Sequence, residues 1–351
     1  MEFALTDEQA MIAETAREFF AENATSERTR AAMASDGIDR DLWAAFCGEL
    51  GLGGLLIAED HGGAGLGMVE FASVAEAAGA QVAPLPLLGL AAAGTAIASG
   101  GSAAQQTRWL PRLASGKVIA TSGSSPELIV SDNRLSGTVP FLPHGHAADI
   151  FLLSDSMGVW IVEADAGGIA ISTPTTMDQT RPLATVTLEN VTGDPLENSK
   201  AGLDAGHAVG WLCLTAEALG GAQACLDRTI NYAKDRIQFG RPIGSFQAYK
   251  HRLADMMIEI EQARSAVYWA ACAIDEDIDD PELALHAAKS FCADTYFQCA
   301  ADMIQLHGGI GFTWEHDAHL FFKRARSIQT MMRDGDWHRE QVAAMVLGDA
   351  A

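Results

Sequence analysis

A turn near residue 240 combines cationic, amide and glycine residues in a way that suits the binding of an anion. In the stretch DRIQFGRPIG, Arg236, Gln238 and Arg241 lie close together beside Gly240. A guanidinium can pair with a phosphate through two parallel hydrogen bonds, and a glycine lets backbone N–H groups approach the anion because it has no Cβ. The same residues would also suit a structural Gly-Pro turn between two helices. Both interpretations stay open on this stretch alone.

A second glycine turn, QLHGGIGF at residues 305–312, follows about 60 residues further along the chain. Its paired glycines could again bring backbone N–H groups close to the oxygens of a diphosphate. Taken alone, the pattern favours the plainer interpretation of a helix end.

Helices must position both turns. Over residues 212–233 the apolar side chains recur every three, four or seven positions, the period of one helix face. Gly240 and Pro242 break this pattern, and a second helix with the same period begins near Ser245. We expect the two helices to pack as antiparallel neighbours in a bundle.

The rest of the chain divides by composition. A capping box of Thr6 and Gln9 opens the first of several helices, whereas short β-branched segments bounded by Gly, Pro, Asp or Asn predict a small antiparallel β domain in the middle. We therefore predict an N-terminal helical domain over residues 1–115, a middle β domain over 116–200 and a C-terminal helical bundle over 201–351.

The two turns, in this order, resemble those of the acyl-CoA dehydrogenase family. In that family an Arg-x-x-Phe-Gly turn with a downstream Phe-Gln, and a Gln-x-x-Gly-Gly-x-Gly turn, hold the pyrophosphate and adenosine end of an FAD bound mainly by the neighbouring subunit. The resemblance implies a mainly α fold with a small β domain and a C-terminal four-helix bundle that contacts FAD and oligomerises. The FAD contacts that it implies in this chain are Arg236, Gln238, Phe239, Phe246, Gln247, Gln305, Leu306, His307, Gly308 and Gly309.

Other segments match the family only in part. Residues 59–66 resemble a loop that leads into a helix bordering the family's acyl pocket, but no β-α-β pattern surrounds it, so we interpret its glycines as structural. The run with Asp178, Thr180 and Arg181 resembles the second half of the family's β domain. Its first half is about 20 residues shorter than in the family and keeps only a remnant of the loop that hydrogen-bonds the flavin ring, at residues 124–126.

The reaction implied by the resemblance is the α,β-desaturation of an acyl-CoA thioester. It needs a carboxylate to take the α-proton while a hydride leaves the β-carbon for the flavin. The family's usual glutamate would fall on Met332, with Asp334 two residues further on, and an alternative position falls on Gly210. The remaining carboxylate candidate is Glu217, seven residues later on the same helix face.

Each candidate carboxylate also has a structural interpretation, which we favour. Glu217 lies in an apolar stretch and could be a buried or interfacial hydrogen-bonding group. Asp334 lies in an acidic turn at a helix end, and Asp336 with His338 could form a pair there, but an exposed turn is the simpler explanation.

Composition limits the partners and the compartment. The formal net charge of −23 and the pI near 4.6 argue against nucleic acid or an anionic membrane, because either would need a basic face. The six cysteines show neither C-x-x-C nor Cys/His metal spacing, which predicts buried reduced thiols and no metal site. The absence of a basic-then-apolar N-terminal signal and of an apolar run of about 18 residues predicts a cytoplasmic protein with no membrane span.

Three functions stay open. The retained turns together with the lost flavin-ring loop favour a catalytically silent subunit that lends its FAD contacts to a homologous partner. In this respect the chain resembles the shorter subunit of mixed tetramers that degrade steroid side chains. The alternatives are a competent homo-oligomeric dehydrogenase that uses Glu217 or Asp334, and a related flavin oxidase or monooxygenase. The resemblance implies FAD, an acyl-CoA substrate, a homologous subunit and an electron-transfer acceptor protein.

Overall fold

The computed structural model describes residues 4–155, 157–277 and 280–348. Its backbone contacts form two compact units, which we describe separately. The helical unit comprises Met1–Ser26, Met68–Ala83 and Leu214–Ala351, and the mixed unit comprises Glu27–Gly67 and Pro84–Cys213. The division into three domains, at residues 1–115, 116–200 and 201–351, remains a prediction.

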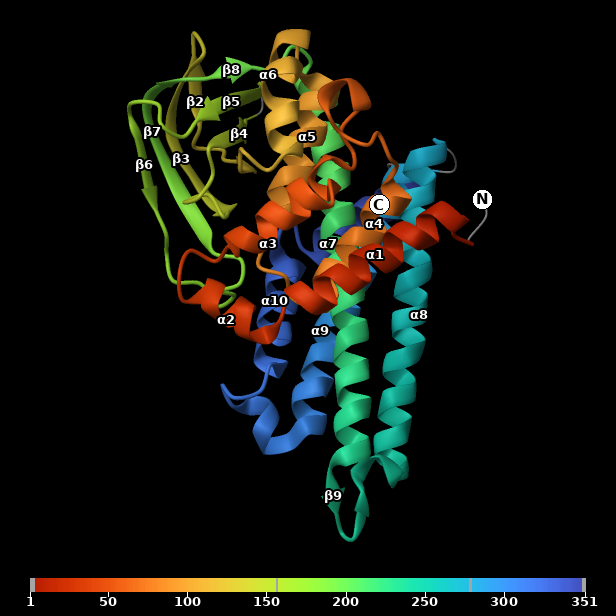
Figure 1. Ribbon diagram of the computed structural model, residues 1–351. Coiled ribbons are helices and arrows are strands. Elements are labelled where there is room, and N and C mark those ends of the chain that lie inside the picture. The colour runs from red at the N-terminus through yellow and green to blue at the C-terminus, as the bar shows by residue number, and fades with distance from the viewer. Residues whose placement is uncertain (1–3, 156, 278–279, 349–351) are drawn as a thin grey trace. The chain divides into compact units, whose positions relative to one another are not determined.

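The helical unit is built from long helices joined by short turns (Figure 1). A hairpin of β9 and β10 joins α7 to α8, and the 3₁₀ turn η5 follows α9. Its elements are α1 (Asp7–Asn23), α4 (Met68–Ala80), α7 (Ser199–Asp235, whose first residues belong to the mixed unit), β9 (Ile237–Gln238), β10 (Arg241–Pro242), η4 (Ile243–Ser245), α8 (Gln247–Glu276), α9 (Pro281–His307), η5 (Gly308–Phe312), α10 (Ala318–Thr330) and α11 (Gly335–Leu347).

Two adjacent glycines of α7 allow its neighbours to approach closely. A Cβ on Gly220 would lie 1.8 Å from the carbonyl oxygen of Glu76 in α4, and one on Gly221 would lie 2.3 Å from the ring of Tyr296 in α9. Real Cβ atoms do not make such short contacts, so the close packing of these helices requires glycine at both positions.

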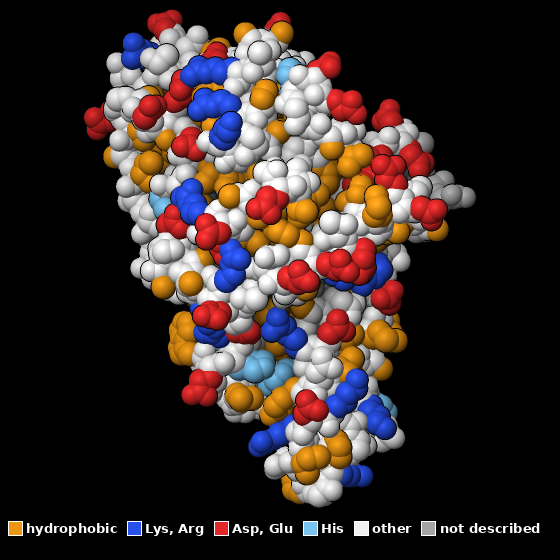
Figure 2. Space-filling model, viewed as in Figure 1, with side chains coloured by type: hydrophobic (Ala, Val, Ile, Leu, Met, Phe, Trp, Pro, Cys, Tyr) orange, Lys and Arg blue, Asp and Glu red, His pale blue; other side chains and the backbone are white. Residues whose placement is uncertain are grey.

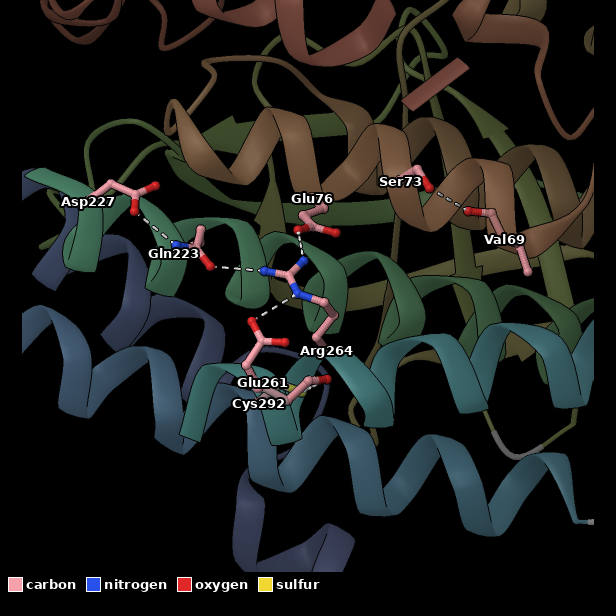
Figure 3. A network of polar contacts seen from close by, with 9 residues as sticks. Val69, Ser73, Glu76, Gln223, Asp227, Glu261, Arg264 and Cys292 are labelled. Atoms are coloured by element: carbon pink, nitrogen blue, oxygen red, sulfur yellow. Dashed lines mark hydrogen bonds and ion pairs between the residues drawn. The ribbon is translucent and has the colours of Figure 1, made fainter. Parts of the chain in front are cut away.

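Arg264 of α8 ties three helices of this unit together (Figure 3). Its guanidinium donates to Glu76 of α4 at 2.6 Å and to Gln223 of α7 at 2.9 Å. It also contacts Glu261, one turn earlier on α8, at 3.4 Å. Because each donor of the planar guanidinium meets a different helix, this side chain fixes how α4 lies on α7 and α8.

The mixed unit combines short helices with two small sheets. The sheet orders are β1-β4-β5-β8 and β2-β3-β7-β6. All strand pairs in them are antiparallel except β1 with β4, which run parallel with Ala120 opposite Ile150. Its elements are α2 (Ser26–Met33), α3 (Arg40–Ala44), η1 (Ala45–Glu49), η2 (Leu52–Gly54), η3 (Glu59–His61), α5 (Leu87–Gly100), α6 (Ala103–Ala114), β1 (Ala120–Ser124), β2 (Ile129–Ser131), β3 (Arg134–Pro143), β4 (Ile150–Ser154), β5 (Val159–Glu163), β6 (Ile169–Ser172), β7 (Leu183–Thr192) and β8 (Asp194–Pro195).

The glycine-rich loop after η3 is structural, as the sequence predicted. A Cβ on Gly63 would lie 2.0 Å from the carbonyl oxygen of Ile57, and Gly62 and Gly65 adopt positive φ angles of 79° and 63°. These glycines serve the loop's own packing and turns.

Two further predictions, the first helix cap and the buried free cysteines, are confirmed. The capping box of Thr6 and Gln9 is present, and all six cysteines are free and buried. Burial raises the pKa of Cys47 to about 12, which keeps its thiol protonated and unreactive.

Among the described residues, α7 is the one helix long and apolar enough to cross a membrane, and 89% of its most apolar 18-residue stretch is buried within the protein, as in a core helix.

Candidate functional site

The predicted anion turn is a tight β-hairpin. Gln238 pairs with Arg241, and the Ile243 amide donates to the Arg236 carbonyl at 2.9 Å. Both central residues have positive φ angles, 52° at Phe239 and 74° at Gly240, as a type I′ turn requires. A phenylalanine in this conformation is uncommon, and this one is 90% exposed. The hairpin therefore exposes an aromatic side chain, and the backbone of that residue adopts an unfavourable conformation.

The second turn starts where α9 ends. Gly308 has φ 63° and ψ −141°, a conformation open essentially to glycine alone. Gly309 is different, because its φ is not positive and an added Cβ would meet nothing within 4 Å. Within the described residues no contact requires glycine at position 309.

Two tyrosines connect the turns. The hydroxyl of Tyr249, in the first turn of α8, donates to the carbonyl of Leu306 at 2.9 Å. Burial, with a smaller effect from Tyr232, raises the pKa of Tyr249 to about 12, so the phenol keeps the proton that it donates. The ring of Tyr232 stacks on His307 with centroids 4.4 Å apart. The structure thus brings together two motifs that are distant in the sequence.

The side chain of His307 points inward. The residue is 3% exposed, and its ring also contacts the ring of His316, with centroids 4.4 Å apart. Its Nδ1 lies 2.7 Å from the carbonyl of Met303. Burial lowers the pKa of His307, so at neutral pH the ring is neutral and Nδ1 carries the proton donated to Met303. The buried side chain of His307 therefore packs beneath the backbone of the glycine turn, inside the protein, and does not lie on its surface.

The other predicted contacts face outward or lie at the rim. Around the hairpin, Lys and Arg side chains gather together with hydrophobic ones (Figure 2). The exposed polar members are Arg236, Gln238, Gln247 and Gln305. The exposed apolar side chains of the hairpin and of the segment after α9 are Ile237, Phe239, Ile310, Phe312 and Trp314. The surface thus offers a cation, three amides and several aromatic rings, which suits a nucleotide with a diphosphate.

Sequence reasoning missed the two tyrosines. Tyr232 lies four residues before Arg236, and this helical spacing was a signal that could have placed its ring near the turn. The contact of Tyr249 with Leu306 had no such signal, because it joins residues 57 apart. Sequence reasoning also gave no partner for Glu217, which the structure identifies as Arg324 of α10, a side chain that is 2% exposed and lies in the core.

Glu217 is the partner of that buried arginine. Its carboxylate is 3% exposed and lies 3.7 Å from the Arg324 guanidinium, across from α7 to α10. A buried charge is tolerated when it is paired in this way. The arrangement gives Glu217 a structural role in the helical unit.

Asp334 is the N-cap of α11. Its carboxylate accepts a hydrogen bond from the Trp337 amide at 3.0 Å. The structure does not bring Asp336 and His338 together as a pair, because Asp336 is exposed and binds Arg339 at 2.7 Å whereas His338 is buried. The two carboxylates of the acidic turn therefore make structural contacts, Asp334 with a backbone amide of α11 and Asp336 with Arg339.

Comparison with known proteins agrees with this architecture. The family model "Acyl-CoA dehydrogenase, N-terminal domain" matches residues 6–117, and "Acyl-CoA dehydrogenase, C-terminal domain" matches residues 208–347. The chain is 36% identical over 331 residues to "Acyl-CoA dehydrogenase IpdE2" of Mycolicibacterium smegmatis, which covers 93% of this chain and 95% of that protein.

Two solved structures are similar over their whole length. A chain of the ChsE4-ChsE5 complex from Mycobacterium tuberculosis aligns with a TM-score of 0.92 and 26% identity, covering 100% of both chains. A variant of the Tcur3481-Tcur3483 steroid ACAD aligns with a TM-score of 0.89 and 31% identity, covering 98% of this chain and 99% of that one. The chain therefore belongs to the acyl-CoA dehydrogenase family of flavin-dependent oxidoreductases, and the predicted fold class is confirmed.

The buried pair predicts how Glu217 variants behave. Glu217→Ala should lower the free energy of unfolding by about 3–5 kcal/mol, because it leaves the Arg324 charge buried without its partner. Replacing both residues by Leu and Met should restore most of that loss. Urea unfolding midpoints at constant m-value measure both effects. Glu261→Ala, which removes a more exposed partner of Arg264, is the control and should cost less than about 1 kcal/mol. A stable but inactive Glu217→Ala protein would instead support a catalytic base.

The N-cap offers a sharper test for Asp334. Asparagine caps helices as well as aspartate does but cannot take a proton. Asp334→Asn should therefore keep both stability and acyl-CoA desaturation by the assembled protein, whereas Asp334→Ala should cost about 1 kcal/mol of stability. A drop in turnover of about a hundredfold in the stable Asn variant would identify Asp334 as the base and contradict the structural interpretation.

Proposed function

We propose that this chain is one subunit of a hetero-oligomeric, FAD-dependent acyl-CoA dehydrogenase, and that it lends its two turns to a flavin nucleotide bound mainly by a homologous partner subunit. The observation that carries the proposal is the built surface around Tyr249. There, the Tyr249–Leu306 hydrogen bond ties the start of α8, next to the hairpin, to the end of α9, next to the glycine turn, and Arg236, Gln247 and Gln305 are exposed on this surface.

The residues of this surface fit the diphosphate and adenosine end of FAD. Arg236 would pair with the diphosphate, and Gly309 would let it approach the backbone, since open space lies where a Cβ would be. Gln238, Gln247 and Gln305 offer amide groups for the sugar and phosphate oxygens. Bound FAD supplies the acceptor for the hydride that leaves the substrate β-carbon.

Two features favour a silent subunit over a self-sufficient enzyme. Glu217 and Asp334 are engaged in structural contacts, in the buried ion pair and the helix cap, and no carboxylate occupies the family's usual position at Met332. The β domain also lacks most of the loop that the family uses on the flavin ring. The partner would then supply the base and the flavin-ring contacts.

The relatives support the assembly and the substrate class. Both solved structures carry the names of two proteins, ChsE4 with ChsE5 and Tcur3481 with Tcur3483, and the second is called a steroid ACAD. We extend this to a heterotetramer acting on an acyl-CoA whose acyl group derives from fatty acid or steroid degradation. An electron-transfer acceptor protein would reoxidise the flavin, and the cytoplasm stays the predicted compartment.

The visible spectrum tests the proposal directly. The chain purified alone should be colourless, and it should become yellow and active on acyl-CoA only when it is co-expressed with a homologous subunit. A yellow protein that an acyl-CoA bleaches anaerobically without a partner would overturn the proposal in favour of a homo-oligomeric dehydrogenase. Rapid reoxidation of the reduced flavin by O₂ would point to an oxidase or monooxygenase.

Gly309→Ala gives a matched test of the lent turn. In the isolated chain the substitution should leave stability unchanged, because the added Cβ meets nothing and the backbone needs no positive φ. In the co-expressed complex it should lower FAD retention about tenfold or more, measured as bound flavin per complex after gel filtration. Gly48→Ala is the control, because its Cβ also meets nothing within 4 Å. Equal flavin content in both variants would show that Gly309 does not approach the cofactor.

A further inference from the structure

Two buried histidines join α11 to α9. The Nδ1 atoms of His286 and His338 lie 2.7 Å apart, and the rings are 1% and 0% exposed. A hydrogen bond between two Nδ1 atoms needs one donor and one acceptor, so at least one ring must keep an unprotonated Nδ1. Protonation of both rings would place two N–H groups and two positive charges against each other and break the contact.

Two further side chains of α9 hold the same region. The ammonium of Lys289 is buried and donates to the carbonyl of Ile328, near the end of α10, at 3.0 Å. Asp294 accepts from Gln329 of α10 at 2.8 Å and from Arg339 of α11 at 2.9 Å. We call His286, Lys289 and Asp294 the α9 platform, since together they bind the helices on both sides of the connecting turn.

The turn between α10 and α11 is strained. Met332 and Arg333 have φ angles of 54° and 78°, in the left-handed region that side chains other than glycine's rarely adopt. Such backbone conformations persist only where the surrounding structure holds them. A strained turn that is held from both sides will relax when one side is released.

We propose that the α9 platform is a pH-sensitive latch, in which the His286–His338 contact holds α11 and the strained turn in place and releases them when both imidazoles are protonated. The inference goes beyond the proposed function, because it concerns the attachment of this segment and needs no flavin to be tested.

The charges around the pair set the direction. The groups that act on it are Asp280 at the N-cap of α9, Glu282 and Lys289 of α9, and Asp334 and the Met332 backbone of the turn. Burial, together with the smaller effects of Lys289 and His286, lowers the pKa of His338 to about 3, against the opposing effects of the Met332 backbone and Asp334. Burial also lowers the pKa of His286, against Glu282 and Asp280.

The sign of the pH effect follows from these shifts. Both histidines have a lower pKa in the latched state than the value of about 6.5 for an exposed histidine. The released state therefore takes up protons first, and the latch loses stability as the pH falls below about 6.5. It keeps its full strength above that pH. Lys289, whose pKa burial lowers to about 8, is still charged at neutral pH and opposes the protonation of its neighbours.

Hydrogen exchange of the full-length chain tests the latch. Between pH 7 and 5, after correction for the intrinsic rate, amides in residues 331–347 should exchange about tenfold faster or more, while those of the buried core of α7 stay unchanged. Acceleration of both regions at the same pH would mean global unfolding and overturn the proposal. No acceleration of residues 331–347 would overturn it as well. This comparison uses the wild-type chain, so it does not depend on how any variant folds.

Asparagine variants identify the responsible groups. An asparagine amide can replace Nδ1 in a hydrogen bond but does not titrate in this range. His338→Asn should reduce the pH dependence from two protons to one, and the double variant with His286→Asn should remove it. His251→Asn changes an exposed histidine of α8 and should leave the wild-type pH dependence intact. Variants that retain the wild-type slope would contradict the assignment.

Discussion

A single hydrogen bond, from Tyr249 to the carbonyl of Leu306, sets the geometry on which the proposed cofactor surface depends. The last four carbonyls of an α-helix have no partner within that helix, and Leu306 is the last residue but one of α9. The phenol of the neighbouring helix supplies the missing donor. The end of α9 is thereby tied to the start of α8, and the glycine turn and the hairpin that these helices carry keep a fixed spacing.

Whether a feature could be predicted from the sequence depends on whether it arises from neighbouring residues or from residues that are far apart in the chain. The main strands of the mixed unit and the long helices follow from periodicity and β-branched composition, which are local properties. The parallel pairing of β1 with β4 does not, since it depends on which segments meet in three dimensions. Tyr249 escaped notice for the same reason, because its partner is 57 residues away and no spacing rule joins them.

The candidate carboxylates show where reasoning from types and spacing reaches its limit. The sequence identified Glu217 and Asp334 as acids and offered a structural alternative for each. Only the fold supplies the partners, a buried arginine on α10 for Glu217 and the first backbone amides of α11 for Asp334. Both contacts use the ionised or hydrogen-bond-accepting carboxylate. A residue that must exchange a proton with substrate would give up that contact in every turnover, so the structural and catalytic roles compete.

Net charge and local charge act at different distances on an anionic cofactor. The chain carries a formal charge of −23, which opposes the approach of FAD or an acyl-CoA. At an ionic strength of 0.1 M, however, exposed charges are screened beyond about 10 Å. Within that range the exposed Arg236 and the backbone of the open glycine turn would act directly on the diphosphate of the proposed FAD. The proposed binding of FAD at this surface would therefore depend on short-range contacts that the hairpin and the turn make together, and the fixed spacing between them would matter more than the sign of the whole protein's charge.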